Sequence, residues 1–183
     1  MAVRLSIRPF MIDPATQPDG EEYAAYNRRR WGGDGWTHSM KAMGRREGAP
    51  YADWRTWPNT THCGRLLLLA EQQGLGDRVV GILYSYCYEK GHNVSLRETV
   101  ARAAEEAGVQ GGAEYVQSDA GTAELEQALR GQRVNGKRVS AAPTFNITVA
   151  GMSHDFSGAQ DTERWTLMLE QCADMAADAR RAE

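Results

Sequence analysis

The sequence predicts a mixed α/β fold, and three observations support this prediction. The first residues alternate between apolar and polar side chains, as in a strand with one buried face. The long middle region is rich in helix caps and amphipathic spacing, and the last quarter pairs a β-branched segment with a further helix. At 183 residues, with 42% hydrophobic and 25% charged residues, the chain is typical of one soluble globular domain with room for an inserted subdomain.

The N-terminal region predicts one strand and two helices. Val3 to Phe10 places Val3, Leu5 and Ile7 on one side, and the Asp13-Pro14 turn ends the alternation. Helices are expected over Asp19–Arg30, with Asp19 as the cap, and over Thr37–Arg46. Tyr51 to Trp57 is expected to be extended, because it is aromatic and precedes a proline.

The middle region predicts four helices. Asn59 or Thr60 caps a helix that runs through Gln73, and Asp77 begins the next, which ends near Lys90. Ser95 and Glu98 have the spacing of a capping box at the start of a third helix, and Thr122–Arg130 is the fourth. The third helix carries an apolar stripe formed by Leu96, Val100, Ala103, Ala104 and Ala107.

The C-terminal region predicts a hairpin and a helix. Thr144 to Val149 is β-rich, Gly151 indicates a turn, and Met152 to Phe156 returns beside the first strand. Ser157 to Gln160 again has capping-box spacing and is expected to begin the last helix. Pro143, which opens the strand pair, lacks a backbone N–H, so it fits the start of a strand and favours a cis peptide bond in a tight loop.

Charge and composition exclude several classes of function. The net charge of −3 gives no basis for binding nucleic acid or an anionic membrane. The longest apolar run, Leu66 to Ala70, is too short to span a bilayer, and the N-terminus lacks the pattern of a secretory signal. Three scattered cysteines, Cys63, Cys87 and Cys172, favour a reducing compartment, so a cytoplasmic location is expected.

The sequence offers little chemistry of its own. It contains no Cys-x-x-Cys pair, and His38, His62, His92 and His154 show no metal-ligand spacing, so no metal site is expected. Cys63 would lie in the first turn of its helix, where the helix dipole lowers the pKa of a thiol, but packing between helices is the favoured interpretation. Cys87 and Cys172 are interpreted as packing residues.

Eight short fragments stand in order over nearly the whole chain. They are Arg8-Pro9-Phe10, Gly20-Glu21-Glu22-Tyr23, Pro58-Asn59-Thr60, Glu89-Lys90-Gly91-His92-Asn93-Val94, Glu105-Glu106-Ala107-Gly108, Ser118-Asp119, Val139-Ser140-Ala141-Ala142-Pro143-Thr144-Phe145 and Ser157-Gly158-Ala159-Gln160. Together they resemble the FrnE-like branch of the DsbA-like thioredoxin family. This branch is related to the 2-hydroxychromene-2-carboxylate isomerases and the kappa-class glutathione transferases.

The resemblance implies a thioredoxin-like fold with a large helical insertion. Residues 1–58 and 132–183 would form a partial thioredoxin-like domain around an inserted subdomain at 59–131. In such proteins a strand and a helix carrying Cys-x-x-Cys precede the strand that matches Val3–Phe10, so the sequence lacks a unit of about 30 residues. That strand would lie between Val3–Phe10 and Thr144–Val149, which must otherwise pair directly, stay exposed or borrow a strand from another chain.

The resemblance also implies the residues of a binding site. Ala142, Pro143 and Thr144 match the cis-proline loop that aligns an extended substrate through main-chain hydrogen bonds. Ser157, Gly158 and Gln160 match a helix N-terminus that holds a glutathione carboxylate in related proteins, and simple capping is the alternative. Asn59 matches a polar position near the ligand cleft, and capping explains it equally well.

Three functional hypotheses remain. The chain is a thiol–disulfide oxidoreductase whose N-terminal unit is missing through truncation or a mistaken start site, and it is redox-inactive without the dithiol. Alternatively it is a noncatalytic module that binds a peptide or glutathione, or a glutathione-dependent isomerase or transferase relative. The expected partners are thiol- or disulfide-containing polypeptides or glutathione, with a homodimer or a strand-donating chain as further partners; glutathione is the one candidate cofactor.

Overall fold

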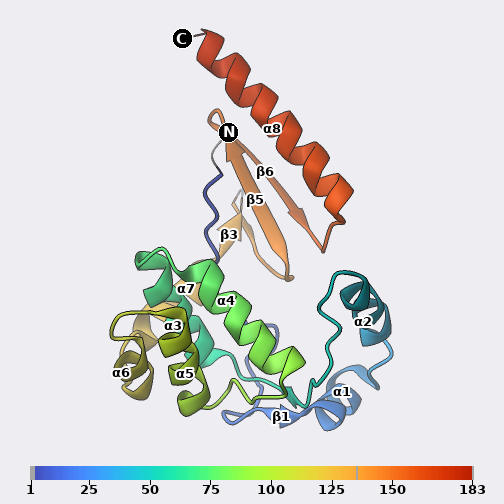
Figure 1. Ribbon diagram of the computed structural model, residues 1–183, viewed down its shortest axis with the longest axis vertical. Helices are drawn as coiled ribbons and strands as arrows, with labels where there is room; N and C mark the ends of the chain where they lie inside the picture. The colour runs from blue at the N-terminus through green and yellow to red at the C-terminus, as the bar shows by residue number, and fades with distance from the viewer. Residues whose placement is uncertain (1–2, 135, 183) are drawn as a thin grey trace. The chain divides into compact units, whose positions relative to one another are not determined.

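The computed structural model describes residues 3–134 and 136–182 and divides the chain into two compact units. The larger unit spans residues 5–130, and the smaller one joins the first four residues to residues from 131 onward. Helices and strands alternate irregularly along the chain, as expected for an α/β protein (Figure 1). The family-based division into residues 1–58 with 132–183 and an insertion at 59–131 stays a prediction.

The larger unit is predominantly helical and contains one short sheet. Strands β1 (Glu21–Glu22) and β2 (Thr56–Trp57) pair antiparallel. The helices are α1 (Tyr23–Trp31), α2 (Thr37–Arg46), α3 (Thr61–Gln72), α4 (Gly76–Tyr84), the π-helix η1 (Ser85–Glu89), α5 (Arg97–Ala107), α6 (Gly112–Gln117) and α7 (Thr122–Gly131).

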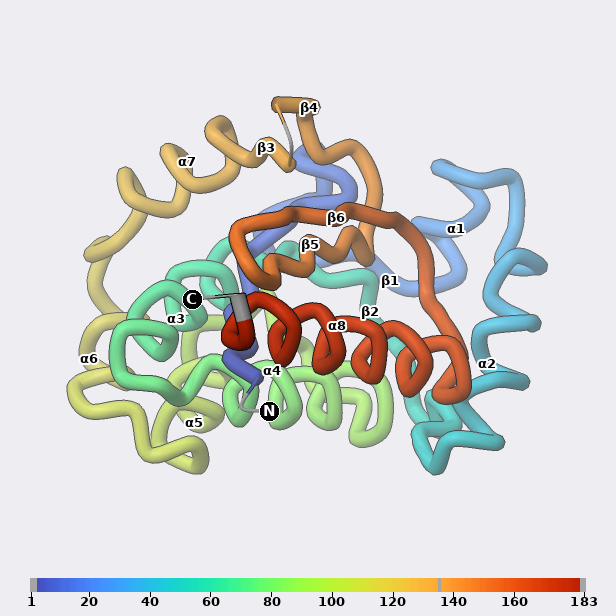
Figure 2. The backbone as a smooth tube through the Cα atoms, turned by 90° about the horizontal axis from the view of Figure 1, so that it is seen from above, coloured from blue at the N-terminus to red at the C-terminus, as the bar shows by residue number. Residues whose placement is uncertain are grey.

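The core of the larger unit lies among α3, α4, α5 and α6, which pack side by side (Figures 1 and 2). The predicted stripe on α5 is confirmed, since Val100, Ala103, Ala104 and Ala107 are fully buried and Leu96 is half-buried. Helix α5 ends at Gly108, whose φ of 77° is the left-handed conformation that glycine adopts at no steric cost. Burial of an amphipathic face therefore specifies this helix, as the sequence predicts.

The strand predicted over Val3–Phe10 does not form. These residues have no strand partner among the described residues, and Val3 and Leu5 remain about two-thirds exposed. The N–H of Ile7 and the hydroxyl of Ser6 instead donate to the carboxylate of Glu71 on α3. Alternation alone cannot produce a strand, because a strand needs a neighbour for its backbone N–H and C=O groups.

Two predicted caps are also wrong. Helix α1 begins at Tyr23 rather than Asp19, because the carboxylate of Glu22 accepts the N–H groups of Ala24 and Ala25. The Ser95–Glu98 capping box does not form, since the Ser95 hydroxyl accepts the N–H of Asn59 and α5 begins without a side-chain cap. In both places a competing hydrogen bond decides where the helix begins.

The smaller unit contains two hairpins and the long helix α8 (Thr162–Ala182). Strands β3 (Arg133–Val134) and β4 (Lys137–Arg138) form the short hairpin, and β5 (Thr144–Val149) and β6 (Met152–Ser157) form the longer one. The predicted strand pair and turn are thus confirmed. Helix α8 lies against the β5–β6 hairpin (Figures 1 and 2), where Trp165 packs edge-on against Phe145 at 4.8 Å and tilted against Phe156 at 5.4 Å between ring centroids.

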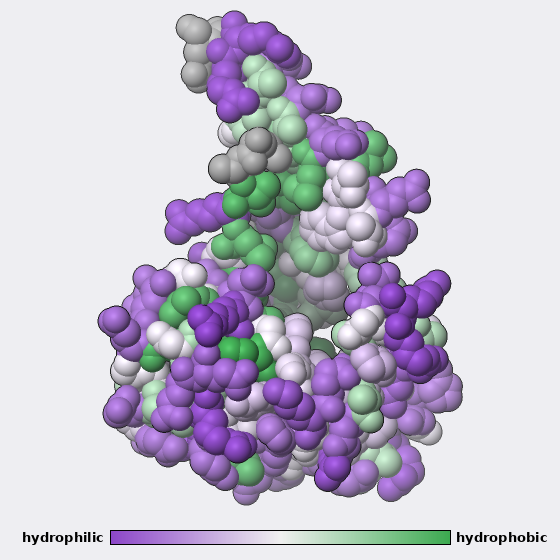
Figure 3. All heavy atoms as spheres, in the orientation of Figure 1, coloured by the Kyte–Doolittle hydropathy of each residue, from purple (hydrophilic) through white to green (hydrophobic). Residues whose placement is uncertain are grey.

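The smaller unit has no fully enclosed core among its described residues. Every buried hydrophobic side chain among the described residues belongs to the larger unit, whereas Met152, Leu167 and Leu169 stand exposed on the smaller one. Apolar surface is accordingly visible over the hairpin and α8 in Figure 3. The apolar stripe of α8 is only half-buried, because two strands are too narrow to cover it.

Candidate functional site

The proline loop and the first residues of β5 form the candidate site of the smaller unit. The Ala142–Pro143 peptide bond is cis, as the sequence predicts. The carbonyl of Pro143 accepts the N–H of Gly158 at 2.9 Å, and the hydroxyls of Thr144 and Ser157 lie 2.9 Å apart. These two contacts join the proline loop to the end of β6, so four predicted site residues meet at the open end of the hairpin.

Ser157 to Gln160 do not begin a helix, contrary to the prediction. Ser157 is the last residue of β6, and α8 begins at Thr162. Asp161 caps this helix through its side chain, which accepts the N–H of Arg164 at 2.8 Å. The Gln160 amide instead donates to the carbonyl of Gly158. No free helix N-terminus therefore stands at the predicted glutathione-binding residues.

The register of the hairpin fixes which backbone groups of β5 face outward. Pro143 and Gly158 share a hydrogen bond, and β5 pairs with β6 residue by residue up to Val149 and Met152. Because inward and outward groups alternate in an antiparallel pair, Phe145, Ile147 and Val149 point their N–H and C=O groups toward β6. Those of Thr144, Asn146 and Thr148 point away from it.

The outward edge of β5 is unpaired. No described residue forms a backbone hydrogen bond with the outward N–H and C=O groups of Thr144, Asn146 or Thr148. This edge continues directly from the cis-proline loop, and Ala142 and Pro143 are exposed there. The sequence did not single out Asn146 and Thr148, although their alternation with Phe145, Ile147 and Val149 already indicated a strand with one polar face.

The cysteines do not form a reactive site. The Cys63 thiol donates to the carbonyl of Val94 at 3.2 Å and packs against the core of the larger unit. Burial raises the pKa of Cys63 to about 12, the direction opposite to a helix-dipole effect, and burial likewise raises the pKa of Cys87 to about 12. Cys172 lies on α8 in the smaller unit, and all three thiols are free. The packing interpretation of Cys63 therefore holds.

Asn59 acts as a local cap in the larger unit. Its side-chain oxygen accepts the N–H of Thr61 at 3.1 Å and the Thr61 hydroxyl at 2.7 Å. Its amide nitrogen donates to the carbonyl of Thr16, so the side chain ties the loop before β1 to the start of α3. These bonds confirm the capping alternative; a ligand-binding role for Asn59 stays a prediction.

A buried guanidinium organises the loop between α6 and α7. Arg65, which is 1% exposed, donates to the carbonyls of Tyr115, Ser118 and Ala120 and contacts the Nδ1 atom of His62 at 3.0 Å.

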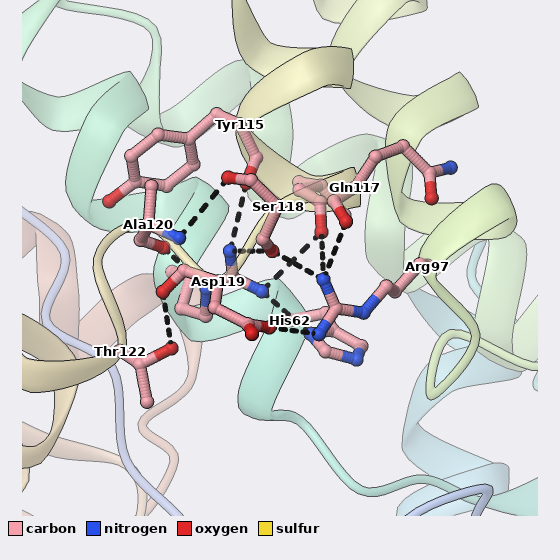
Figure 4. A network of polar contacts seen from close by, with 10 residues as sticks. His62, Arg97, Tyr115, Gln117, Ser118, Asp119, Ala120 and Thr122 are labelled. Atoms are coloured by element: carbon pink, nitrogen blue, oxygen red, sulfur yellow. Dashed lines mark hydrogen bonds and ion pairs between the residues drawn. The ribbon is translucent and has the colours of Figure 1, made fainter.

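Arg97 binds the same loop through the carbonyls of Val116, Gln117 and Ser118 and the carboxylate of Asp119 (Figure 4). Backbone carbonyls and the Asp119 carboxylate accept the guanidinium N–H groups of Arg65 and Arg97. The two arginines therefore hold the loop in place and do not form an anion site.

Two further classes of site are not found. In the part of the chain that the structure describes, no three His, Cys, Asp or Glu side chains are grouped closely enough to hold a metal ion. Within that same part, no helix has both the length and the apolar character needed to cross a membrane.

Comparison with known proteins identifies relatives of the fold. Residues 1–169 match the family model described as the DSBA-like thioredoxin domain. The chain is also similar to a crystal structure described as a probable DsbA oxidoreductase from Streptomyces coelicolor. That similarity has a TM-score of 0.67 and 19% sequence identity, and it covers 89% of this chain and 72% of the other. A search of curated proteins gave no significant match.

Proposed function

Because the chain belongs to the family of DSBA-like thioredoxin domains, we propose that it is a relative of the thiol–disulfide oxidoreductases that binds extended polypeptides without exchanging disulfides itself. The observation that carries this proposal is the state of its thiols. The 183 residues hold no Cys-x-x-Cys pair. Cys63 is half-buried against the core and Cys87 is buried, and burial raises the pKa of both thiols. The same three free thiols support a cytoplasmic location.

Disulfide exchange needs a thiolate that can reach a substrate sulfur. With a pKa of about 12, Cys63 or Cys87 is thiolate in only about one molecule in ten thousand at pH 8. Cys172 is the one cysteine of the smaller unit, so it has no resolving thiol there. Exchange by these residues would therefore be slow at neutral pH.

Binding of an extended polypeptide is supported by the loop and strand at the candidate site. Ala142 and Pro143 are exposed, and no described residue forms a backbone hydrogen bond with the outward N–H and C=O groups of Thr144, Asn146 and Thr148, which are the groups that an added strand would use. Strand addition depends on main-chain hydrogen bonds and not on a thiol. Binding of an extended polypeptide therefore does not need a cysteine, whereas disulfide exchange does.

Insulin reduction tests the redox half of the proposal. With dithiothreitol as reductant, the purified chain should precipitate insulin no faster than dithiothreitol alone. Alkylation by iodoacetamide at pH 8, read by peptide mass, should modify Cys172 before Cys63 and Cys87, and a Cys172→Ser variant should stay unmodified until it is unfolded. Catalysed reduction at rates typical of dithiol enzymes would overturn the proposal.

A thiol-free probe tests the binding half. Carboxymethylated insulin B chain, labelled with fluorescein, should raise its anisotropy saturably when the protein is added. A proline-rich peptide of equal length should not, because it lacks most of the N–H groups that strand addition uses. Equal binding of both peptides, or of neither, would contradict binding through the backbone of β5.

A further inference from the structure

A row of four aromatic rings runs through the larger unit from its surface to its interior. Trp31, the last residue of α1, and Trp36, just before α2, have ring centroids 6.1 Å apart. Trp36 in turn lies 6.3 Å from Trp57 on β2. Trp57 stacks on Tyr26 of α1 at 4.1 Å, with 7° between the ring planes. These four residues form the aromatic row, in which each ring contacts the next.

The two ends of the aromatic row differ in their access to solvent. Trp31 is 46% exposed and Trp36 is 43% exposed, so a small oxidant in solution can reach both rings. Trp57 and Tyr26 are buried, so such an oxidant cannot reach either of them directly. An electron that leaves Tyr26 for the surface therefore has a path of touching rings through the tryptophans.

The buried end of the aromatic row holds a proton acceptor. The Tyr26 hydroxyl donates to the carboxylate of Asp13 at 3.2 Å. Loss of one electron makes a phenol strongly acidic, so a tyrosine is oxidised readily only where a base within hydrogen-bond reach takes its proton. Asp13 is such a base. Tyr26 can therefore lose an electron and a proton together without contact with solvent.

The charges around the aromatic row favour movement of an electron from Tyr26 toward Trp31. The guanidinium of Arg30 lies 4.2 Å from the ring centroid of Trp31, where it disfavours the positive charge of an oxidised tryptophan. Its Nε atom also lies 3.8 Å from the Asp13 carboxylate, a long and partly exposed ion pair that leaves Asp13 able to accept a proton. Arg29 lies 5.3 Å over the Tyr26 ring, but it does not oppose a tyrosyl radical, which is neutral once its proton has left.

We propose that the aromatic row passes an electron from Tyr26 to Trp31 whenever Trp31 has lost one to a freely diffusing one-electron oxidant. The electron travels through Trp57 and Trp36, and the phenol proton of Tyr26 moves to Asp13. Trp31 is thereby restored, and the products are a neutral tyrosyl radical and a neutral carboxylic acid. The positive charge of the oxidised tryptophan and the negative charge of the carboxylate cancel, so charge and atoms balance.

Tyr26 is the tyrosine best placed to end this transfer. Tyr23 contacts Trp54 rather than a ring of the aromatic row, and its hydrogen bond to the carboxylate of Asp34 is longer, at 3.4 Å. Tyr88 likewise contacts Trp54, so an electron from either residue needs one transfer more. The radical would then reside on a buried ring, where oxygen and water attack it less readily than they attack an exposed tryptophan.

Pulse radiolysis measures the transfer directly. Azide radicals oxidise the exposed tryptophans of the purified chain, and transient absorption follows the conversion of the tryptophan radical into the tyrosyl radical. In the unaltered chain the conversion should be first-order and independent of protein concentration, because the electron moves within one molecule. Tyr26→Phe keeps an aromatic ring against Trp57 and removes the phenol, so it should slow the conversion by an order of magnitude.

Tyr86→Phe is the matched control. Tyr86 is also buried and also donates to a carboxylate, that of Glu106 at 2.6 Å, but its ring contacts His92 and no ring of the aromatic row. This control should keep the rate and the yield of the unaltered chain. Equal rates in Tyr26→Phe and Tyr86→Phe, or a conversion whose rate rises with protein concentration, would overturn the proposal.

Two further variants test the path and the base without removing a buried ring. Trp36→Phe interrupts the aromatic row at a partly exposed position, so the radical on Trp31 should persist longer. Asp13→Asn leaves a hydrogen-bond acceptor but no base, so the tyrosyl radical should form more slowly. Far-UV circular dichroism should be unchanged in both. An unaltered conversion in either variant would refute the part of the transfer that it tests.

Lasting damage to Trp31 gives a second measurement. Under continuous generation of azide radicals, peptide mass should show several-fold more oxidised Trp31 in Tyr26→Phe than in Tyr86→Phe, because the tryptophan is no longer restored. Equal damage in the two variants would contradict the transfer. The transfer uses no cysteine and no residue of the smaller unit, so it stands or fails independently of polypeptide binding at β5.

Discussion

Burial decides the proton affinity of the side chains at the start of α3. A rise in the pKa of Cys63 from 9.0 to about 12 corresponds to about 4 kcal/mol against the thiolate. A helix dipole contributes at most about 2 kcal/mol in its favour, so burial outweighs it. The sequence shows the position of Cys63 in the first turn, but whether a first-turn residue faces solvent or the core depends on which helices pack above it.

The neighbouring His62 makes the folded state less stable as the pH falls. Burial, followed by the positive charges of Arg97 and Arg65, lowers the pKa of His62 below 6.5 in the folded chain. As the pH falls below 6.5, the unfolded state binds a proton that the folded state resists. This contribution to stability is therefore complete above pH 6.5 and is lost as the pH falls toward the lower folded pKa.

Replacement of His62 by glutamine should make the free energy of unfolding depend less on pH below about 6.5. Urea unfolding between pH 7.5 and about 5 should show a smaller loss of free energy for His62→Gln than for the unaltered chain, since glutamine can still accept from Arg65. His38→Gln, at an exposed position on α2, is the control and should follow the unaltered chain. A pH dependence that survives unchanged in His62→Gln would contradict the assignment.

At the scale of elements, helices were predictable and strands only partly so. The helices α2, α3, α5 and α7 lie close to where periodicity and stop signals place them, because a helix satisfies its hydrogen bonds within its own segment. The residues Val3–Phe10 alternate well and still form no strand, because pairing depends on a partner elsewhere in the chain. Likewise, the absence of a described partner on the outward edge of β5 follows from the observed pairing and not from any local pattern.

The turn between β5 and β6 gives a prediction of its own. Ala150 and Gly151 have φ values of 49° and 76°, as a two-residue type I′ turn requires. Alanine in the left-handed region costs about 1–2 kcal/mol, whereas glycine avoids that penalty. Ala150→Gly should therefore stabilise the hairpin by about 1 kcal/mol after glycine's greater chain entropy is taken into account.

Amide hydrogen exchange at Val149 and Met152, which face each other across this turn, measures the effect. Protection should rise in Ala150→Gly and fall in Gly151→Ala, which puts a second side chain in the left-handed region. Unchanged protection in both variants would show that another feature of the smaller unit limits the stability of the hairpin.

For the whole molecule, the distribution of buried side chains predicts two levels of stability against local unfolding, a higher one for the larger unit and a lower one for the smaller unit. The larger unit holds the entire described hydrophobic core, and the smaller unit holds only half-buried apolar side chains. Local unfolding needs less free energy where fewer apolar contacts are broken. The resemblance to a known family predicted the fold class correctly, but this imbalance depends on which strands find partners.

Exchange of amide hydrogens across the whole chain should resolve these two levels. In a dilute sample, amides of α3, α4 and α5 should exchange slowest, and those of β5, β6 and α8 should exchange fastest within regular structure. Protection of α8 equal to that of α5 would contradict the two levels, since a half-buried helix would then be as stable as the core.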